Sequence, residues 1–459
     1  MNTQDEIRKL IARSLRIKTK DVKDTLSFQS IPEWDSLSHV TLMVALEQKF
    51  AVTISNRDTA RLTSVESIIK FVCDFIDSKN IAVPNYDQPA NPKTIHRGLN
   101  GVYFDNTLIS EIDVDENRVS YRGWDLKILA ARYDFETVAY LLIFGNIPAE
   151  TELNLWKLEM SRKRNLNQSQ IAILEQLKYS HPAFALRTMI SVMGQKTGEG
   201  PDEMKKEYES EAIRFLACAP TIIANHHRLR MGLEYIHPSP ALSHAANFLY
   251  MLNGRYPEES HVKALDSDLT IHAEHGSNAS AFAARVAIGA QTDFVSALTA
   301  AISTFTGRVH GGALEEVLKM LGELNKPADV KPYIDRRMSS NLGVPGFGHR
   351  LYKKEDPRSA LLLDILMNLS ADRSQTIDWD IIKEIRSQMQ IYRTKGLEIN
   401  VDFYAGLSYR LLGIPDDMAV SIFFMARIAG LNAHILEQSK NNILIRPLLQ
   451  YAGKRHEAN

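Results

Sequence analysis

The sequence predicts a mostly α-helical protein in two parts, a small helical bundle followed by a larger helical domain. Its length of 459 residues exceeds one ordinary core and indicates two or three domains. Apolar residues recur at helical spacing over most of the chain, whereas strand signals are few. Residues 81–96 contain three prolines and almost no apolar periodicity, which is the composition of an extended linker.

Residues 1–80 predict a compact bundle of three helices. Apolar side chains return every three or four positions in three stretches, as in helices that bury one face. These stretches are Ile7 to Leu15, Leu37 to Val44 and Val65 to Val72.

Residues 97–459 predict a second, mostly helical domain. Its clearest helical patterns cover residues 135–144, 241–252, 279–288 and 418–437. The clearest strand signal lies over residues 108–120, where apolar and polar residues interleave.

Composition indicates a globular protein, with 44% hydrophobic and 24% charged residues and a formal net charge of −1. Nucleic-acid and membrane-surface binders carry a large positive field, so neither class is expected. The N-terminus lacks the apolar core of a secretory signal, and no run of roughly 18 apolar residues is expected to span a membrane. The only cysteines, Cys73 and Cys218, predict no disulfide framework and fit a cytoplasmic protein.

Ser36 stands where a modified serine would be stabilised. The segment IPEWDSLSHV puts Ser36 at the start of the second predicted helix, exposed at the turn. A phosphodiester there would meet unpaired backbone N–H groups and the positive end of the helix dipole. The alternative is that Asp35 or Ser36 only caps the helix.

Residues 1–80 resemble an acyl or peptidyl carrier protein in length, in helical pattern and in the Pro-Glu-Trp that precedes Asp35-Ser36-Leu37. The resemblance implies that a phosphopantetheinyl transferase attaches 4'-phosphopantetheine to Ser36, whose thiol then holds an acyl group. Carriers of fatty-acid synthesis are usually strongly acidic along this helix, whereas Glu47 is its only acid here. A linker of about 16 residues reaches roughly 20–25 Å, so a tethered carrier needs less charge steering.

Four segments of the second part combine His, Arg and Asp beside glycines or at helix edges. They are LTIHAEHGSNAS, GRVHGGALEE, GFGHRLYKKEDPRS and NVDFYAG. Glycines beside His310 and His349 let backbone and ligand approach closely, which favours a site over a core. Taken singly, these residues also fit a loop histidine or a surface arginine. His272 and His275 are spaced for a metal, but no third and fourth ligand follow a zinc pattern, so no metal is expected.

Residues 97–453 resemble a bacterial-type citrate synthase, and 2-methylcitrate synthases share the same motifs. The likeness runs from GLNGVYFDNTLISEID and SYRGWDL through AYLLIFGNIP to RPLLQY, with GFGHRLYKKEDPR as the most specific motif. It implies a two-lobed helical domain over residues 97–459, with a small lobe at about residues 310–407.

The resemblance also implies catalytic roles that suit the chemistry. Removing a weakly acidic proton next to a thioester needs a carboxylate base and a donor for the enolate oxygen, and Asp402 and His310 match these positions. We expect His310 to be neutral, because an imidazolium would pair with the base and quench it. His349 matches the group that polarises the carbonyl of the 2-oxo acid and protonates it.

A dicarboxylate acceptor needs cations with fork geometry, which arginine supplies, and three arginines for one acceptor favour oxaloacetate over a monocarboxylate such as pyruvate. The matching positions are Arg358, Arg427 and Arg446, with His275 as a further contact to the oxo acid. In the family the last arginine reaches into the partner subunit's site, so a homodimer is implied.

Arg308, Lys353 and Lys354 are candidate contacts for the thioester or for a phosphate of coenzyme A or phosphopantetheine. Arg308 replaces a proline that the family often has, and Leu314 replaces an asparagine. Both departures lie near His310 and reshape the thioester side of the pocket without removing a catalytic group. The alternative for Arg308 is a surface arginine.

We therefore expect condensation of an acyl thioester, either acetyl-CoA or an acyl group on the Ser36 arm, with oxaloacetate to give citrate or a citrate-like product. The product stays on the carrier or leaves it. One alternative is a conventional citrate or 2-methylcitrate synthase whose carrier domain serves another enzyme. A second is an inactive scaffold that presents an acyl carrier.

Overall fold

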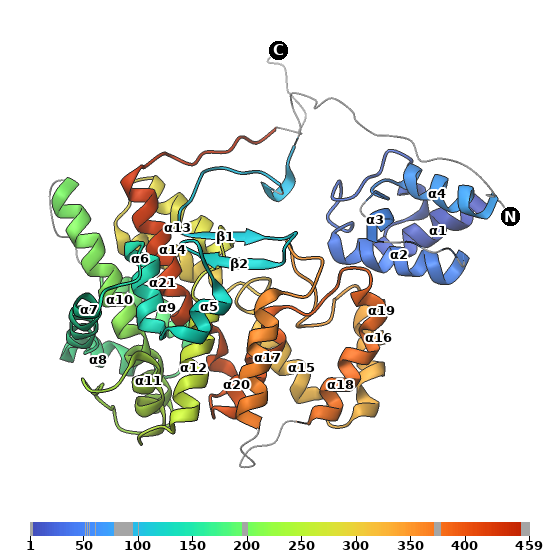
Figure 1. The fold of residues 1–459 in the computed structure, drawn as a ribbon. Helices are drawn as coiled ribbons and strands as arrows, with labels where there is room; N and C mark the ends of the chain where they lie inside the picture. The colour runs from blue at the N-terminus through green and yellow to red at the C-terminus, as the bar shows by residue number, and fades with distance from the viewer. Residues whose placement is uncertain are drawn as a thin grey trace.

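The computed structural model describes residues 3–77 except 51, 53, 55 and 60, residues 95–194 except 100, and residues 201–370 and 378–450. Two separate hydrophobic cores, over residues 7–72 and 109–436, correspond to a small bundle and a larger domain (Figure 1). Of the predicted linker at residues 81–96, all but the last two residues lie outside the described ranges. The mostly helical fold class predicted from the sequence is confirmed.

The small bundle contains the three predicted helices, α1 (Thr3–Leu15), α2 (Ser36–Phe50) and α4 (Val65–Asp77). A short helix that the sequence did not predict, α3 (Asn56–Thr59), lies between the last two. His39 of α2 connects α3 to the bundle, because one ring nitrogen accepts from the Trp34 indole at 3.1 Å and the other donates to the Thr59 carbonyl at 2.9 Å. The apolar face of each long helix is buried in one common core.

The strand signal near residue 110 is a hairpin rather than one strand. Strands β1 (Ser110–Asp113) and β2 (Arg118–Tyr121) pair antiparallel, and β3 (Trp124–Asp125) pairs with β2 to complete a three-stranded sheet of order β1-β2-β3. Asn117 has φ 52° at the end of the turn, a left-handed conformation that asparagine adopts more readily than most residues. The turn residues 114–117 continue the polar alternation, so the pattern alone conceals the reversal.

The remaining helices form the larger domain, and several begin at a side-chain cap such as Asp134, Ser243 or Asn278. The four helical patterns predicted there correspond to α6, α11, α13 and α21. The full set is α5 (Leu126–Arg132), α6 (Phe135–Phe144), α7 (Glu150–Lys163), α8 (Gln168–Gln176), α9 (Pro182–Val192), α10 (Pro201–Arg230), α11 (His244–Asn253), α12 (Glu259–His272), α13 (Ala279–Gly289), α14 (Phe294–Phe305), α15 (Ala313–Glu323), α16 (Val330–Ser339), α17 (Pro357–Ser370), α18 (Trp379–Gln388), α19 (Gln390–Arg393), α20 (Val401–Leu411) and α21 (Ala419–Lys440).

Helix α21 is the central, buried helix of the larger domain. Helices α6, α10, α12, α13 and α14 all pack against it, and nearly all of its side chains are buried. Contrary to the expectation from sequence, Asp416–Lys440 is long and apolar enough to cross a membrane by composition. Its most apolar window is entirely buried within the domain, so the same composition here makes a core helix.

Candidate active site

The candidate catalytic residues come from loops and helix ends that converge beside α21. His310 lies in the turn before α15, and its ring is 4.8 Å from that of Phe305, which in turn contacts Phe423 of α21. His349 lies in the loop before α17, with its ring 5.4 Å from that of His275. Asp402 lies in the first turn of α20. Arg427 of α21 lies close enough to His310, His275 and Asp402 to act on the pKa of each, so segments more than 100 residues apart in the sequence are brought to one place.

The ring of His310 lies against the N-terminus of α13. Its Nε2 accepts from the Ser280 backbone N–H at 3.3 Å and lies 2.9 Å from the Ser280 hydroxyl. A backbone N–H only donates, so Nε2 carries no proton and the proton of the neutral ring is on Nδ1. Burial, helped by the charge of Arg427, lowers the pKa of His310 to about 4. Near neutral pH this ring is an uncharged donor of one N–H, as expected from the sequence.

The carboxyl group of Asp402 is buried, with 8% of the residue exposed. Asn400 caps α20 by accepting from the Asp402 N–H at 3.0 Å, which sets the first turn of the helix. Burial raises the pKa of Asp402 to about 6, although the charges of His272 and Arg358 act in the opposite direction. A carboxylate with this pKa is a stronger base than a solvated one and is still ionised at neutral pH.

His349 presents its other nitrogen to the site. Its Nδ1 accepts from the backbone N–H groups of Leu351 and Tyr352 at 3.1 and 3.2 Å, so the proton of the neutral ring is on Nε2. Burial lowers the pKa of His349 to about 4. His275 is held by the Tyr352 hydroxyl at 2.9 Å, and burial followed by the charge of Arg358 keeps its pKa well below the ordinary value. Both rings are neutral near pH 7.

Two buried arginines supply the positive charge of the site. Arg358 makes two side-chain hydrogen bonds to Asp356, at 3.0 and 2.7 Å. Arg427 donates from Nε to the His272 carbonyl at 2.7 Å. Burial lowers the pKa of Arg427 to about 10, which leaves it charged at neutral pH. Two fork-shaped cations in a desolvated site suit a dicarboxylate.

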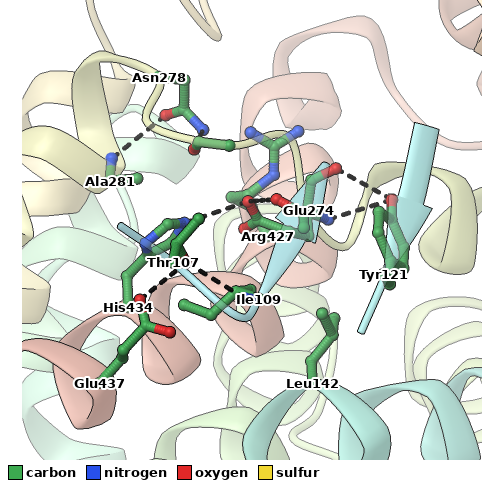
Figure 2. A network of polar contacts seen from close by, with 12 residues as sticks. Thr107, Ile109, Tyr121, Leu142, Glu274, Asn278, Ala281, Arg427, His434 and Glu437 are labelled. Atoms are coloured by element: carbon green, nitrogen blue, oxygen red, sulfur yellow. Dashed lines mark hydrogen bonds and ion pairs between the residues drawn. The ribbon is translucent and has the colours of Figure 1, made fainter. Parts of the chain in front are cut away.

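A polar network around Glu274 acts on Arg427 through the charge of its carboxylate (Figure 2). The Glu274 carboxylate accepts from the Ser110 hydroxyl at 3.0 Å and lies 3.1 Å from His434 Nε2. Burial opposes the ionisation of Glu274, but His434 and Arg427 outweigh it and the pKa of Glu274 is lowered. An added Cβ at Gly430 would collide with this carboxylate, so only glycine at this position lets α21 pack so close to Glu274. Glu274 and Asp356 escaped prediction, although each stands one or two positions from a predicted site residue.

Asp35, rather than Ser36, caps α2. An Asp35 carboxylate oxygen accepts from the Ser38 N–H at 2.8 Å. Ser36 is exposed, and its hydroxyl makes no hydrogen bond within the described part of the chain. The capping alternative raised from the sequence therefore applies to Asp35, and the hydroxyl of Ser36 remains accessible.

A groove of about 970 Å³ connects the bundle with the larger domain. Its lining includes Ser36 and Leu37 of the bundle and Arg308, His349 and Lys353 of the larger domain. Arg308 and Lys353 make no hydrogen bond or ion pair with any residue that the structure describes. The groove therefore puts the exposed serine and two uncommitted cations on the approach to the buried site.

Two predicted residues lie elsewhere. Lys354 is not among the groove residues, because its ammonium donates to the Asp115 carbonyl at 2.9 Å in the turn between β1 and β2. Its role as a phosphate contact stays a prediction. Arg446 is exposed in the segment after α21 and joins no site of this chain among the described residues.

His275, His349 and Asp356 form a cluster whose potential ligand atoms lie within 4.8 Å of one another. The Asp356 oxygens are occupied by Arg358, and His349 Nδ1 is occupied by backbone N–H groups. Because these ligand atoms already have partners, the contacts favour a site in which Arg358 binds an anion over a metal centre. The absence of a metal stays a prediction.

Comparison with known proteins covers both parts of the chain. Residues 98–448 match the family model "Citrate synthase, C-terminal domain", and residues 5–72 match "Phosphopantetheine attachment site". The 2-methylcitrate synthase of Mycobacterium tuberculosis is 37% identical over 82% of this chain and 94% of its own length. The citrate synthase of Synechocystis sp. is 36% identical over 80% of this chain and 93% of its own.

Solved structures give the same result. The citrate synthase of Thermotoga maritima superposes with a TM-score of 0.73 at 31% identity, over 80% of this chain and 98% of that one. The Thermoplasma acidophilum citrate synthase, in a ternary complex with carboxymethyl coenzyme A and oxaloacetate, gives 0.75 at 26% identity over the same shares. The chain belongs to the citrate synthase family and carries a phosphopantetheine-attachment domain ahead of the condensing domain.

Proposed function

We propose that this protein condenses an acyl thioester with oxaloacetate and that the thioester is carried on phosphopantetheine at Ser36. Asp402 takes a proton from the carbon next to the thioester carbonyl, while the His310 Nδ1–H donates to the oxygen that becomes the enolate. The new carbon–carbon bond forms to the keto carbon of oxaloacetate. The keto oxygen receives the proton from His349 Nε2. The product is a citrate-type thioester, which stays on the arm or is hydrolysed.

The electrostatics of the site support this sequence of steps. The pKa of Asp402 is raised by burial, which strengthens it as a base, and both histidines are uncharged donors in the required tautomers. Neutral histidines leave the negative charge of Asp402 unquenched until substrate arrives. Arg358 and Arg427 are the cations that bind the two carboxylates of the acceptor.

The observation that carries delivery by the carrier is the groove shared by Ser36 and His349. A phosphodiester on Ser36 would lie at the N-terminus of α2, where backbone N–H groups and the helix dipole stabilise it. Arg308 and Lys353 lie in the same groove and are free to add positive charge. The acyl arm would then enter the site without crossing bulk solvent.

Intact-protein mass spectrometry tests the proposal. The full chain is incubated with a phosphopantetheinyl transferase, coenzyme A, acetyl-CoA and oxaloacetate. We expect a pantetheine adduct that gains a citrate-sized acyl group in the wild type and in the control Ser14→Ala, but not in Ser36→Ala. Citrate that appears only in solution, equally in all three proteins, would instead favour a conventional synthase whose carrier serves another enzyme.

We further propose a homodimer in which Arg446 completes the site of the partner subunit. Its exposed position on a segment leading away from α21 supports this, as does the family resemblance. The test is coexpression of Asp402→Asn with Arg446→Ala. Hybrid dimers then contain one site with both groups intact, so activity returns although each parent is impaired. Failure to recover activity in purified hybrids would overturn the role in trans.

A further inference from the structure

The bundle and the larger domain meet at a small, well-defined contact. Asn341 donates to the Ser14 carbonyl at 2.9 Å, and Arg16 donates to the Ser339 carbonyl at 3.4 Å. Lys395, in the turn after α19, makes an ion pair with Glu47 of α2 at 2.7 Å. We call residues 339–343 together with Lys395 the docking face. In Figure 1 the bundle lies beside α16 and α19, which carry these residues at their ends.

Lys395 is the most buried charged group of this contact. Its side chain is 9% exposed and that of Glu47 is 20% exposed. Lys395 also donates to the Ile54 carbonyl, while Glu47 accepts from the Ile54 N–H at 2.7 Å. Glu47 and Ile54 are thus arranged by the bundle itself as a pair of acceptors for one ammonium group. Desolvation makes such a pair sensitive to the loss or reversal of either charge.

Glu47 is also the only acid on α2, a helix that is poor in the acids expected of a widely shared carrier. The single negative charge of the helix is therefore the one that the condensing domain binds. A contact selected by one buried pair depends on geometry more than on long-range attraction, which suits a carrier tethered to its enzyme.

Leu37, the residue after Ser36, anchors the other end of α2. Its side chain packs against the core of the condensing domain rather than against that of the bundle. Gly343 receives it: a Cβ there would lie 3.1 Å from a Leu37 methyl group, and the φ of +65° already disfavours a side chain. Leu37 and Glu47 together fix the position and direction of α2, and hence of Ser36 at the groove.

We propose that the docking face holds the carrier domain of this protein with Ser36 directed into the groove, and that the Lys395–Glu47 pair selects that domain. Docking itself is independent of the reaction. Its benefit for catalysis rests on the proposed function, because only a loaded arm gains from the alignment. The docking face thus recognises a helix in which one acid, Glu47, stands three turns after the modified Ser36.

Crosslinking of the full chain tests docking without reference to activity. Cysteines replace Arg16 and Ser339, whose 3.4 Å hydrogen bond is the weakest of the contacts, and a short bismaleimide joins them. We expect the crosslinked fraction at low reagent to fall about tenfold in Lys395→Glu, since two carboxylates then face each other. The charge swap Lys395→Glu/Glu47→Lys restores the yield. Lys331→Glu, a control on α16 whose ion pair is with Asp335 of the same helix, leaves the yield unchanged.

The same variants separate docking from delivery. The ratio of condensation from the loaded arm to condensation from free acetyl-CoA should fall about tenfold in Lys395→Glu and recover in the charge swap. Unchanged crosslinking in Lys395→Glu, or no rescue by the swap, overturns the docking proposal. A wild type that crosslinks as expected but never condenses from the arm leaves docking intact and overturns the proposed delivery.

Discussion

The functional groups of the condensing site and of the carrier serine differ in their exposure to solvent. Asp402, Arg358 and Arg427 are almost fully buried, and burial raises the pKa of Asp402 and lowers that of Arg427. Hydrogen bonds fix the first turn of α20 at Asp402 and the side chain of Arg427. Ser36 is exposed, and Arg308 and Lys353, which line the same groove, have no hydrogen-bond or ion-pair partner within the described residues. Chemistry that must stabilise developing charge uses preorganised, desolvated groups, whereas a covalent attachment must stay open to another enzyme.

The largest contrast concerns stability. Arg358→Gln leaves the buried carboxylate of Asp356 without its partner, which should lower the free energy of unfolding by about 3–5 kcal/mol. Lys383→Gln removes an exposed partner of Asp380 and should have little effect. Chemical denaturation of both variants checks this. Equal, small effects would mean that water reaches the Arg358 pair and that the contrast in burial is wrong.

Turnover gives the next largest effect. Asp402→Asn keeps the shape of the side chain but removes the base, so kcat should fall by roughly 100-fold or more. Asp364→Asn, an exposed position on α17, serves as the matched control. Steady-state rates with acetyl-CoA and oxaloacetate measure both. Near-normal turnover in Asp402→Asn would remove it from the mechanism.

The pH profile should show one acidic limb. Asp402 acts only as a carboxylate and its pKa is about 6, so kcat/KM is retained above that pH and falls about tenfold for each unit below it. His310 and His349, with pKa values of about 4, stay neutral over the same range and add no limb. Rates between roughly pH 8 and pH 5 test this. A limb that persists in Asp402→Asn would assign the titration to another group.

The smallest effect is expected in the groove. Arg308→Ala should raise KM for a phosphate-bearing thioester by about threefold with little change in kcat, because an exposed charge contributes weakly. The difference should shrink at high salt. Arg336→Ala, an exposed arginine that pairs with Glu323, is the control. An effect of Arg308→Ala on kcat alone would instead connect it with the positioning of His310.

Sequence predicted the elements well where one face of a helix is buried, since apolar spacing alone specifies α6, α13 and α21. It failed at the hairpin of β1 and β2, where the turn that ends at Asn117 continues the alternation of a strand. The short α3 escaped because four residues are too few to show a helical period.

The candidate site was found through motifs, and its supporting residues were not. His310, His349 and Asp402 stand in recognisable segments. By contrast, Asp356, which pairs with Arg358, and Glu274, whose charge acts on Arg427, are recognised only from the packing of the folded chain. Tyr352 and Ser280 act through a hydroxyl or a backbone N–H that no residue pattern signals. The Lys395–Glu47 pair joins residues 348 positions apart, and no pattern in a single sequence indicates a contact over that separation.

The docking face also determines which part of the larger domain the carrier domain would move with. The hydrogen bonds and the ion pair that join it to the bundle all come from residues 339–395, and His349 belongs to that stretch. If that stretch moves as one unit during the reaction, the carrier domain moves with it, and the span from Ser36 to His349 stays constant. An arm of one fixed length can then reach His349 wherever that stretch moves.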